Sequence, residues 1–556
     1  MKKNNTLLIV ILINLLIFSI VNIAFNIKYE QVDDFIIYNL YSGLDGTYNP
    51  HGIYIHPVIC IIVGLFFRII PTINWHSIFL LTMQFICFTI IGYTIIKKQK
   101  SIISIILYTL FASIFYTALL LLIQYTSVSA LLILTAFFVL INETEKENKS
   151  KKWLIISAIL YTVGIMTRMQ SLLIIAPFFA IYLIYYFVKY KFKDKTVKLL
   201  KQYLVLAVIT VIIYISNMII YSSNDLYKNY MEYNDIRAQL HDLSYTNYNQ
   251  NKEIFDKIGW SKNDHYLFYT FNFGDENVYT KENLQEIIDY KKQIGKYYNL
   301  NLDLNNIIEN LKDELINSNT YITLTFLGIF LISLLNKENR KLNILIALTT
   351  VAVHTLFIVL NRSMLRVIIP EYIIGTVLLL YNLKLDINKQ YSIKTIAIIS
   401  ILIPIITINI SGTKYNFNYN LNSYSNYQEL IEYTNSHKEN VYLYTVPSLQ
   451  FRYLTYSVYE MPPKSAFSNL RVMGGWDMFT QNYYDFKQRY NLEGTFLDLL
   501  KDNVYLIDGD VTWSGRKYTN YIENIVLFIK ENYNIDVKYE KINTFDNLYI
   551  YKLERT

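Results

Sequence analysis

This sequence contains few charged residues and few cysteines. Only 17% of its 556 residues are charged and 53% are hydrophobic, whereas soluble domains carry roughly 25% charged residues. This composition excludes an ordinary soluble enzyme, and it is the opposite of the weakly hydrophobic, highly charged composition of disordered chains. Only two cysteines are present, Cys60 and Cys87, both in apolar stretches. No disulfide framework therefore supports the polar parts of the chain.

Several familiar motifs are also missing. The sequence has no P-loop, no His-Glu-x-x-His, no Gly-x-Ser-x-Gly and no Cys-x-x-Cys, which argues against an ATP-driven pump and the common hydrolase designs. The net charge of +7 comes from short basic runs between apolar segments, such as Lys97–Lys100, and not from one basic face. We interpret this charge as membrane topology and expect no nucleic-acid partner.

Long apolar runs dominate what is there, and many are of the length that crosses a bilayer. The first, at 6–27, follows Lys2 and Lys3. It is longer than the core of a signal peptide and no small-residue cleavage site follows it, so we predict an anchor. Further spans are predicted at 77–96, 101–119, 124–142, 153–168, 171–188, 202–222, 319–336, 342–361, 367–383 and 393–410. The chain is thus expected to have about eleven transmembrane helices.

The basic linkers determine the predicted orientation in the membrane. In this register they all lie on the cytoplasmic side together with the N-terminus, as the positive-inside rule requires. The apolar segment 57–70 is short, contains Arg68 and ends at Pro71, so we expect it to lie in the membrane interface or to re-enter. Counting it as a span would place every later basic loop outside. The sequence therefore predicts a multi-pass plasma-membrane protein with a cytoplasmic N-terminus.

Two large polar regions are then extracytoplasmic. The loop 223–318 follows the span at 202–222 and contains helical patterns at 283–298 and 302–316. The tail 411–556 contains predicted strands at 441–446 and 504–508, an amphipathic helix at 518–531, and a hairpin of 535–542 with 548–553. We predict a transmembrane domain at 1–410, with its first outer loop at 28–75, followed by an extracytoplasmic α/β domain at 411–556.

An acidic pair, Asp33 and Asp34, follows the first span directly. Adjacent carboxylates at a membrane surface can bind a divalent metal, or one can act as a base while the other orients it. The alternative is a solvated acidic turn, or a cap for a helix that begins at Phe35. His51 and His56 lie in the same outer loop. They could bind a metal or a phosphate oxygen, or they could be interfacial histidines bonded to backbone or water.

Three arginines lie at predicted outer ends of spans. Arg168 stands between two apolar runs, and Arg362 and Arg366 are four residues apart, so on a helix they would project from one face and could grip a phosphate. The alternative for all three is snorkelling or anchoring to lipid headgroups.

Two other polar segments are weaker candidates. Residues 233–242 and 260–265 mix acids, histidine and aromatic rings, which could line an acceptor site or pack as an ordinary loop. Arg471–Asp477 contains two glycines and a tryptophan that we expect to be exposed. It lacks the context of a phosphate-binding loop, so we interpret it as a structural turn or a weak sugar contact.

The membrane part resembles the GT-C superfamily of integral-membrane glycosyltransferases, which includes protein mannosyltransferases and the bacterial aminoarabinose transferases of lipid A. In that superfamily an acidic pair lies in the first outer loop, and Asp33-Asp34 matches it. The stretch 48–57 and the apolar run after it resemble the surface-helix region of that loop. Arg168 matches by position a basic residue that faces the active-site cavity, and 361–371 matches an arginine-containing stretch near the ninth and tenth spans.

The resemblance implies a polytopic α-helical, GT-C-like fold and an inverting transferase of cell-envelope polysaccharide biosynthesis. Its donor would be a polyprenyl-phosphate-linked sugar drawn from the surrounding membrane lipids, and its acceptor an extracytoplasmic glycan, lipid or protein. Asp33 would deprotonate or orient the acceptor hydroxyl, and Asp34 would support the base or a divalent metal ion, the one cofactor considered. The substrate ligands would be Arg168, Arg362, Arg366, His51 and His56.

Two alternatives from other classes stay open. One is a lipid-linked glycan polymerase or ligase of another membrane fold, which would depend on outer arginine and histidine residues and not on Asp33. The other is a transporter or flippase that moves the lipid-linked sugar without chemistry. A transporter ordinarily carries ionisable residues near the midpoints of its spans, whereas here they gather at the outer ends.

Overall fold

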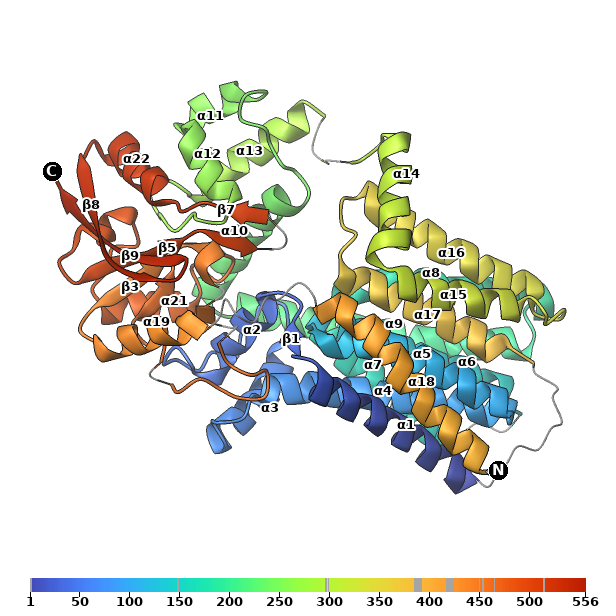
Figure 1. Ribbon diagram of the computed structural model, residues 1–556. Coiled ribbons are helices and arrows are strands. Elements are labelled where there is room, and N and C mark those ends of the chain that lie inside the picture. The colour runs from blue at the N-terminus through green and yellow to red at the C-terminus, as the bar shows by residue number, and fades with distance from the viewer. Residues whose placement is uncertain are drawn as a thin grey trace.

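The computed structural model describes residues 3–147, 150–295, 298, 300–384, 393–416, 425–449, 451–452, 455–464, 466–513 and 516–556. It has two parts, a bundle of long helices and an α/β region with additional helices (Figure 1). The N-terminus lies in the bundle and the C-terminus in the α/β region. The first loop, with α2 (Asp33–Ser42) and α3 (Pro57–Ile69), lies between the two parts.

The bundle contains a helix at each of the eleven predicted spans. They are α1 (Lys3–Ala24), α4 (Trp75–Gln99), α5 (Ile102–Leu121), α6 (Tyr125–Glu145), α7 (Lys151–Thr167), α8 (Leu172–Tyr190), α9 (Asp194–Ser222), α15 (Thr320–Ser333), α16 (Arg340–Val359), α17 (Leu365–Asn382) and α18 (Ile393–Asn416). Within the described ranges, eight helices are long and apolar enough to cross a membrane, or up to nine if a bent pair counts as one span. The chain is a polytopic α-helical membrane protein, and the number of eleven crossings stays a prediction.

The bent pair lies at the end of the long outer loop. Helix α14 (Leu304–Lys312) continues into the π-helix η2 (Asp313–Ser318), and α15 then turns away at an angle of 94°. The predicted helix at 302–316 is therefore present. It lies at a steep angle to α15, the next apolar helix, and not in line with it.

Helix α6 connects the bundle to the first loop. It is buried along nearly its whole length, and the Gln124 side chain caps its start by accepting from the Thr126 and Ser127 amides. Just before it, β2 (Leu122–Ile123) pairs in parallel with β1 (Lys28–Tyr29). This short pairing fixes the beginning of the first loop, and the acidic pair that follows it, against the start of α6.

The short apolar segment of the first loop forms α3, a helix of 13 residues. A helix of this length is too short to span a bilayer. It buries Ile59, Cys60, Val63 and Phe67, whereas Ile61, Leu65 and Ile69 on other faces are exposed. This two-sided character agrees with the predicted position of the segment in the membrane interface.

The α/β region is built on a five-stranded sheet of order β4-β3-β5-β9-β8. The strands are β3 (Val441–Tyr444), β4 (Leu470–Val472), β5 (Val504–Gly509), β8 (Val537–Phe545) and β9 (Leu548–Arg555). Strand β3 runs parallel to both β4 and β5, and β9 is antiparallel to β5 and β8. Two predicted strands and the predicted hairpin are confirmed, as is the amphipathic helix, now α22 (Ile522–Tyr533). The sequence did not indicate β4, α19 (Ser425–Ser436) or α21 (Gln481–Arg489).

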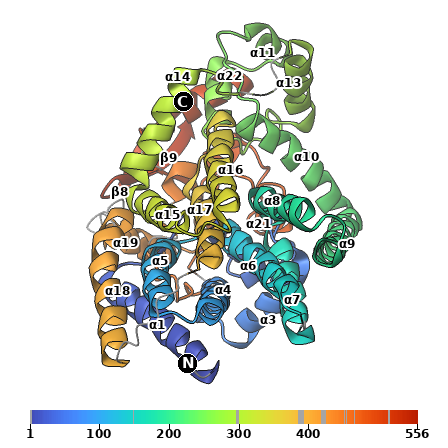
Figure 2. The ribbon, with the colours of Figure 1, turned by 90° about the vertical axis from the view of Figure 1, so that its right-hand side faces the viewer.

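The long outer loop packs on the α/β region. It forms α10 (Asp225–Asp242), α11 (Lys252–Ile258), α12 (Lys262–Tyr269) and α13 (Lys281–Gln293), and Figure 2 shows α10 leading from α9 toward α11 and α13. Residues of these helices, such as Phe268 and Leu284, belong to the same buried apolar cluster as Ile525 and Phe528 of α22. The loop and the C-terminal region therefore form one packed unit.

Candidate active site

The acidic pair occupies the first turn of α2, which begins at Asp33 and ends at Gly43 in the left-handed conformation. Carboxylates in the first turn are favourable because the backbone amides there are unpaired and carry positive partial charge. The two side chains differ in access. Asp34 is 0% exposed, whereas Asp33 is partly exposed. Only Asp33 is therefore open to a substrate.

Asp34 is held in place from two helices. Its Oδ1 lies 2.9 Å from His76 Nε2 and accepts the Tyr125 backbone N–H at 3.1 Å. The other carboxylate oxygen is buried and has no hydrogen-bond partner in the described structure. Burial and the neighbouring Asp33 raise the pKa of Asp34 well above its usual range, while the guanidinium groups of Arg366 and Arg168 lower it in part. The position thus favours the neutral carboxyl group.

Asp33 is contacted from the C-terminal region. Trp476 donates its indole N–H to Asp33 Oδ1 at 3.1 Å. The turn after β4 presents this indole, and glycine is required there because a Cβ on Gly474 would lie 1.9 Å from the Phe271 carbonyl oxygen. The prediction that this tryptophan is exposed is wrong, since Trp476 is 8% exposed. It packs edge-on against Tyr54 at a centroid distance of 4.9 Å.

Arg366, in the first turn of α17, also lies near the acidic pair. Its NH1 donates to Glu30 Oε2 at 3.2 Å, and its carbonyl accepts the Ser127 hydroxyl. Glu30 follows β1 directly, and burial raises its pKa while Arg366 opposes that rise. Glu30 thus balances part of the positive charge of Arg366. The same guanidinium group lowers the pKa of Asp34 electrostatically.

Arg168 comes from the tight hairpin between α7 and α8, as predicted. It caps α7, and the 3₁₀ turn η1 (Met169–Ser171) leads directly into α8. Arg168 donates from NH1 to the Tyr125 hydroxyl at 2.6 Å and lies over the Tyr54 ring at 4.8 Å. Its buried Nε–H has no partner among the described residues. This arginine therefore retains donor capacity for a ligand.

Arg362 does not share a helix face with Arg366. Helix α17 begins only at Leu365, and α16 ends before Asn361, which has a φ of 54°. The left-handed Asn361 breaks the helix, so the four-residue spacing does not translate into one face. Arg362 NH2 instead pairs with Asp242 Oδ2 at 2.9 Å. The expected one-face clamp of two arginines is therefore wrong.

The two histidines of the first loop are engaged in packing. His51 stacks on Tyr227 at 3.8 Å and contacts Asn49, and burial lowers its pKa to about 4. His56 caps α3 through the Val58 amide and bonds the Ser216 hydroxyl. Neither side chain touches the acidic pair in the part of the chain that the structure describes.

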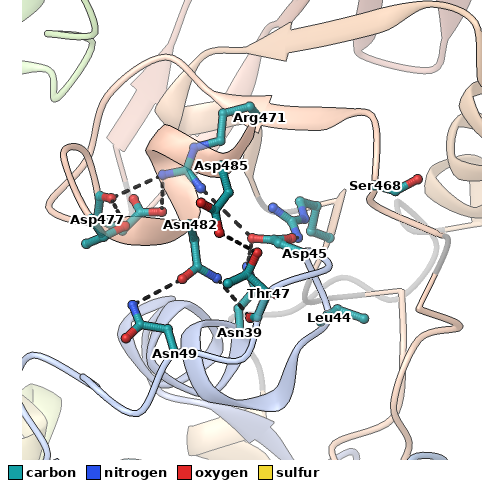
Figure 3. A network of polar contacts seen from close by, with 12 residues as sticks. Asn39, Leu44, Asp45, Thr47, Asn49, Ser468, Arg471, Asp477, Asn482 and Asp485 are labelled. Atoms are coloured by element: carbon teal, nitrogen blue, oxygen red, sulfur yellow. Dashed lines mark hydrogen bonds and ion pairs between the residues drawn. The ribbon is translucent and has the colours of Figure 1, made fainter. Parts of the chain in front are cut away.

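Polar contacts fix the C-terminal region on the loop after α2 (Figure 3). Asp45 pairs with Arg452 at 2.9 Å, and Thr47 donates to Asp485 at 2.6 Å. The Arg452 guanidinium also lies over the ring of Phe35, which is part of α2. The region that carries Trp476 is therefore tied to the helix that carries Asp33.

No protein-family model matches the sequence, and no curated protein matches it either. Two solved structures match nearly the whole chain. One is ArnT from Cupriavidus metallidurans bound to undecaprenyl phosphate, with 9% identity and a TM-score of 0.43 over 99% of this chain and 98% of that one. The other is the apo state of the same protein, with 10% identity and a TM-score of 0.43 over 98% and 97%.

The chain resembles ArnT in overall architecture. The roles of individual side chains rest on the geometry described above.

Asp34 has one carboxylate oxygen, Oδ2, that no hydrogen bond occupies among the described residues. Asp34 Oδ1 already contacts His76 and the Tyr125 amide, and an N–H group competes with a cation for the same oxygen. Across the described ranges, no group of three or more His, Cys, Asp or Glu side chains is arranged to hold a metal.

Sequence reasoning missed Glu30, His76 and Tyr125, and it assigned Trp476 to a structural turn or a weak sugar contact and not to the acidic pair. Of these, Glu30 had a local signal, because it stands three residues before Asp33 in the same loop. The other three lie on distant segments and reach the pair only through the packing of α4, α6 and the turn after β4.

Proposed function

We propose that the chain is a GT-C-type glycosyltransferase that moves a sugar from a polyprenyl-phosphate donor to an extracytoplasmic acceptor of the cell envelope. One observation supports this most strongly. A partly exposed carboxylate, Asp33, stands beside a buried one, Asp34, on which two arginines from separate helices act electrostatically. A base next to cationic groups is the arrangement that transfer from a phosphate leaving group requires.

Asp33 is the proposed general base. It takes the proton of the acceptor hydroxyl, and the hydroxyl oxygen attacks the anomeric carbon of the donor sugar. The bond between that carbon and the phosphate oxygen breaks, and polyprenyl phosphate leaves with the electron pair. By analogy with the GT-C superfamily the attack comes from the face opposite the phosphate, so the anomeric configuration inverts. The Trp476 indole N–H, 3.1 Å from Asp33 Oδ1, orients the carboxylate for this step.

Arg366 and Arg168 are the proposed ligands of the donor phosphate. A guanidinium group can hold two phosphate oxygens with charge-assisted hydrogen bonds, and it stabilises the negative charge that develops on the leaving group. Arg168 has an unpartnered Nε–H for this purpose. Glu30 keeps Arg366 in position through its 3.2 Å contact. A polyprenyl phosphate is also the lipid bound in one of the ArnT structures.

Asp34 positions the site and does not touch the substrate. It is fully buried and bonded to His76 and the Tyr125 amide, so it connects α2 to α4 and α6. Because its pKa is raised, it adds little negative charge beside Asp33. The mechanism requires no metal ion, and the divalent metal expected from the sequence stays open to direct test by chelation.

The test of this function is bond formation by the purified chain in lipid nanodiscs. A radiolabelled polyprenyl-phosphate sugar is supplied with an envelope acceptor fraction, and labelled product and free polyprenyl phosphate are measured. We expect both to form, and Asp33→Asn to abolish them. The same chain is also reconstituted in proteoliposomes, where label that crosses the bilayer without a new bond would support the transporter instead. Full activity in Asp33→Asn would support a polymerase or ligase of another type.

A further inference from the structure

A cavity of about 610 Å³ lies between the outer-loop helices and the C-terminal region. Small-molecule sites typically measure roughly 300–1,000 Å³ and are lined by aromatic groups with a few polar ones. This cavity is lined by aromatic residues of both parts, Tyr230, Tyr233, Tyr279, Phe479 and Tyr484, and by polar residues that include Glu276, Glu282 and Asn229. None of these residues takes part in the acidic site itself.

The chemistry of the walls favours a neutral, hydroxyl-rich ligand. Tyrosine and phenylalanine rings offer apolar faces of the kind on which a sugar ring can lie, and tyrosine adds a polar tip. Carboxylate and amide groups can accept and donate hydrogen bonds to hydroxyls. The charge of Glu276 is balanced by Lys487, whose Nζ lies 2.6 Å from Glu276 Oε1. Lys281 pairs with Glu232, and Glu282 also lines the cavity, so the wall carries charges of both signs and not a cluster of one sign.

Two features of the wall indicate a bound ligand. The Tyr233 hydroxyl is buried and has no hydrogen-bond partner among the described residues, although the side chain is only 8% exposed. Buried polar groups are normally hydrogen-bonded, so this hydroxyl lacks a partner that a ligand could supply. Phe479 has a φ of 65°, a conformation that costs free energy for a side chain of this size and that tends to occur at ligand sites. Its ring meets Tyr233 edge-on at 4.6 Å.

The cavity wall is connected to the acidic site. Tyr230, which lines the cavity, donates its hydroxyl to the Trp476 carbonyl at 2.6 Å. The Trp476 indole in turn donates to Asp33. Two residues, Tyr230 and Trp476, and the two hydrogen bonds that they make thus connect the cavity to the proposed base.

We propose that this cavity binds one or a few neutral sugar residues of a glycan acceptor next to the acidic site. The inference rests on the proposed function, because it makes the acceptor a carbohydrate and assigns it a site. The Tyr233 hydroxyl bonds a sugar hydroxyl, and the partly exposed rings of Phe479 and Tyr484 cover its faces.

The experiment places a single cysteine at Asn229, an exposed position of the cavity wall, in the full chain without its two native cysteines. The rate of maleimide labelling is measured with the neutral polysaccharide fraction of the envelope and, separately, with undecaprenyl phosphate. A cysteine at Ser436, exposed on α19, is the control. We expect the polysaccharide to slow labelling at position 229 alone, and undecaprenyl phosphate to have no effect.

Substitution of two tyrosines tests the site itself. Tyr233→Phe removes the unpartnered hydroxyl, so the polysaccharide concentration that gives half protection should rise about 2- to 10-fold. Tyr490→Phe is the matched control, because Tyr490 does not line the cavity and its hydroxyl donates to the Ser468 carbonyl at 2.9 Å. This variant should leave protection unchanged. Transfer without protection at position 229, or protection by undecaprenyl phosphate, would overturn the site while the proposed function stands. Protection without any transfer would support the site and count against the function.

Discussion

Replacing Trp476 with phenylalanine tests whether the C-terminal region acts on the acidic pair. The change keeps a ring in the buried position and removes only the indole N–H that lies 3.1 Å from Asp33 Oδ1. A hydrogen bond to a charged group contributes about 1.5–3 kcal/mol, or roughly 10- to 150-fold. Because Asp33 is partly exposed, water can replace part of this contact, so we expect the lower end. The rate of sugar transfer at saturating donor should fall about 10-fold, while stabilisation by undecaprenyl phosphate in a thermal shift should not change.

Trp260→Phe is the matched control for this prediction. Trp260 is also buried, at 2% exposed, and its indole donates to the Val278 carbonyl at 3.1 Å within the outer loop. The control loses a comparable hydrogen bond that has no connection to Asp33, so it should lower stability and leave the transfer rate intact. Equal transfer rates in Trp476→Phe and Trp260→Phe would refute the role of the indole in orienting the base.

Three further predictions concern other parts of the molecule. Burial raises the pKa of Asp508 to about 7 from an ordinary value of 3.8. The folded state therefore binds a proton more tightly than the unfolded state, and stability should fall as pH rises from about 4 to 7 and then level off. Melting temperatures of the full chain against pH should show a flatter slope for Asp508→Asn, and an unchanged slope would contradict the burial argument. Arg366→Lys should raise the apparent donor KM by roughly 10-fold because the guanidinium fork is lost. Arg362→Lys should leave the donor KM near wild type, because Arg362 pairs with the half-exposed Asp242. Equal effects of the two variants would remove Arg366 from the phosphate site. Single cysteines at Ser150 and Ser436, in a chain without native cysteines, should label oppositely with an impermeant maleimide in intact cells, and labelling at position 150 would reverse the predicted topology.

Local sequence patterns were enough to predict much of the fold. Apolar length predicted a helix at every proposed span, and alternation around a turn predicted the hairpin of β8 and β9. The brevity of the apolar run at 57–70 predicted the short surface helix α3. Each of these features depends on residues that are close together in the chain, so a local sequence pattern is enough to predict it.

The composition of the site depends on contacts that no local pattern contains. Trp476 meets Asp33 across 443 positions of the chain, and only the packing of the sheet and the glycine turn brings them together. The expected partnership of Arg362 with Arg366 was wrong for the converse reason. Spacing four apart implies a shared face only inside a helix, and the left-handed Asn361 delays the start of α17 until Leu365.

The central claim is that Asp33 acts as the base while buried Asp34 positions it. The most direct measurement is the single-turnover rate of sugar transfer by Asp33→Asn and Asp34→Asn with donor already bound. Loss of a general base typically costs roughly 100-fold or more, so Asp33→Asn should fall by at least about this factor. Asp34→Asn should retain much more activity, because an amide resembles the neutral carboxyl group that the raised pKa favours. Wild-type turnover in Asp33→Asn, or a larger loss in Asp34→Asn than in Asp33→Asn, would contradict the account.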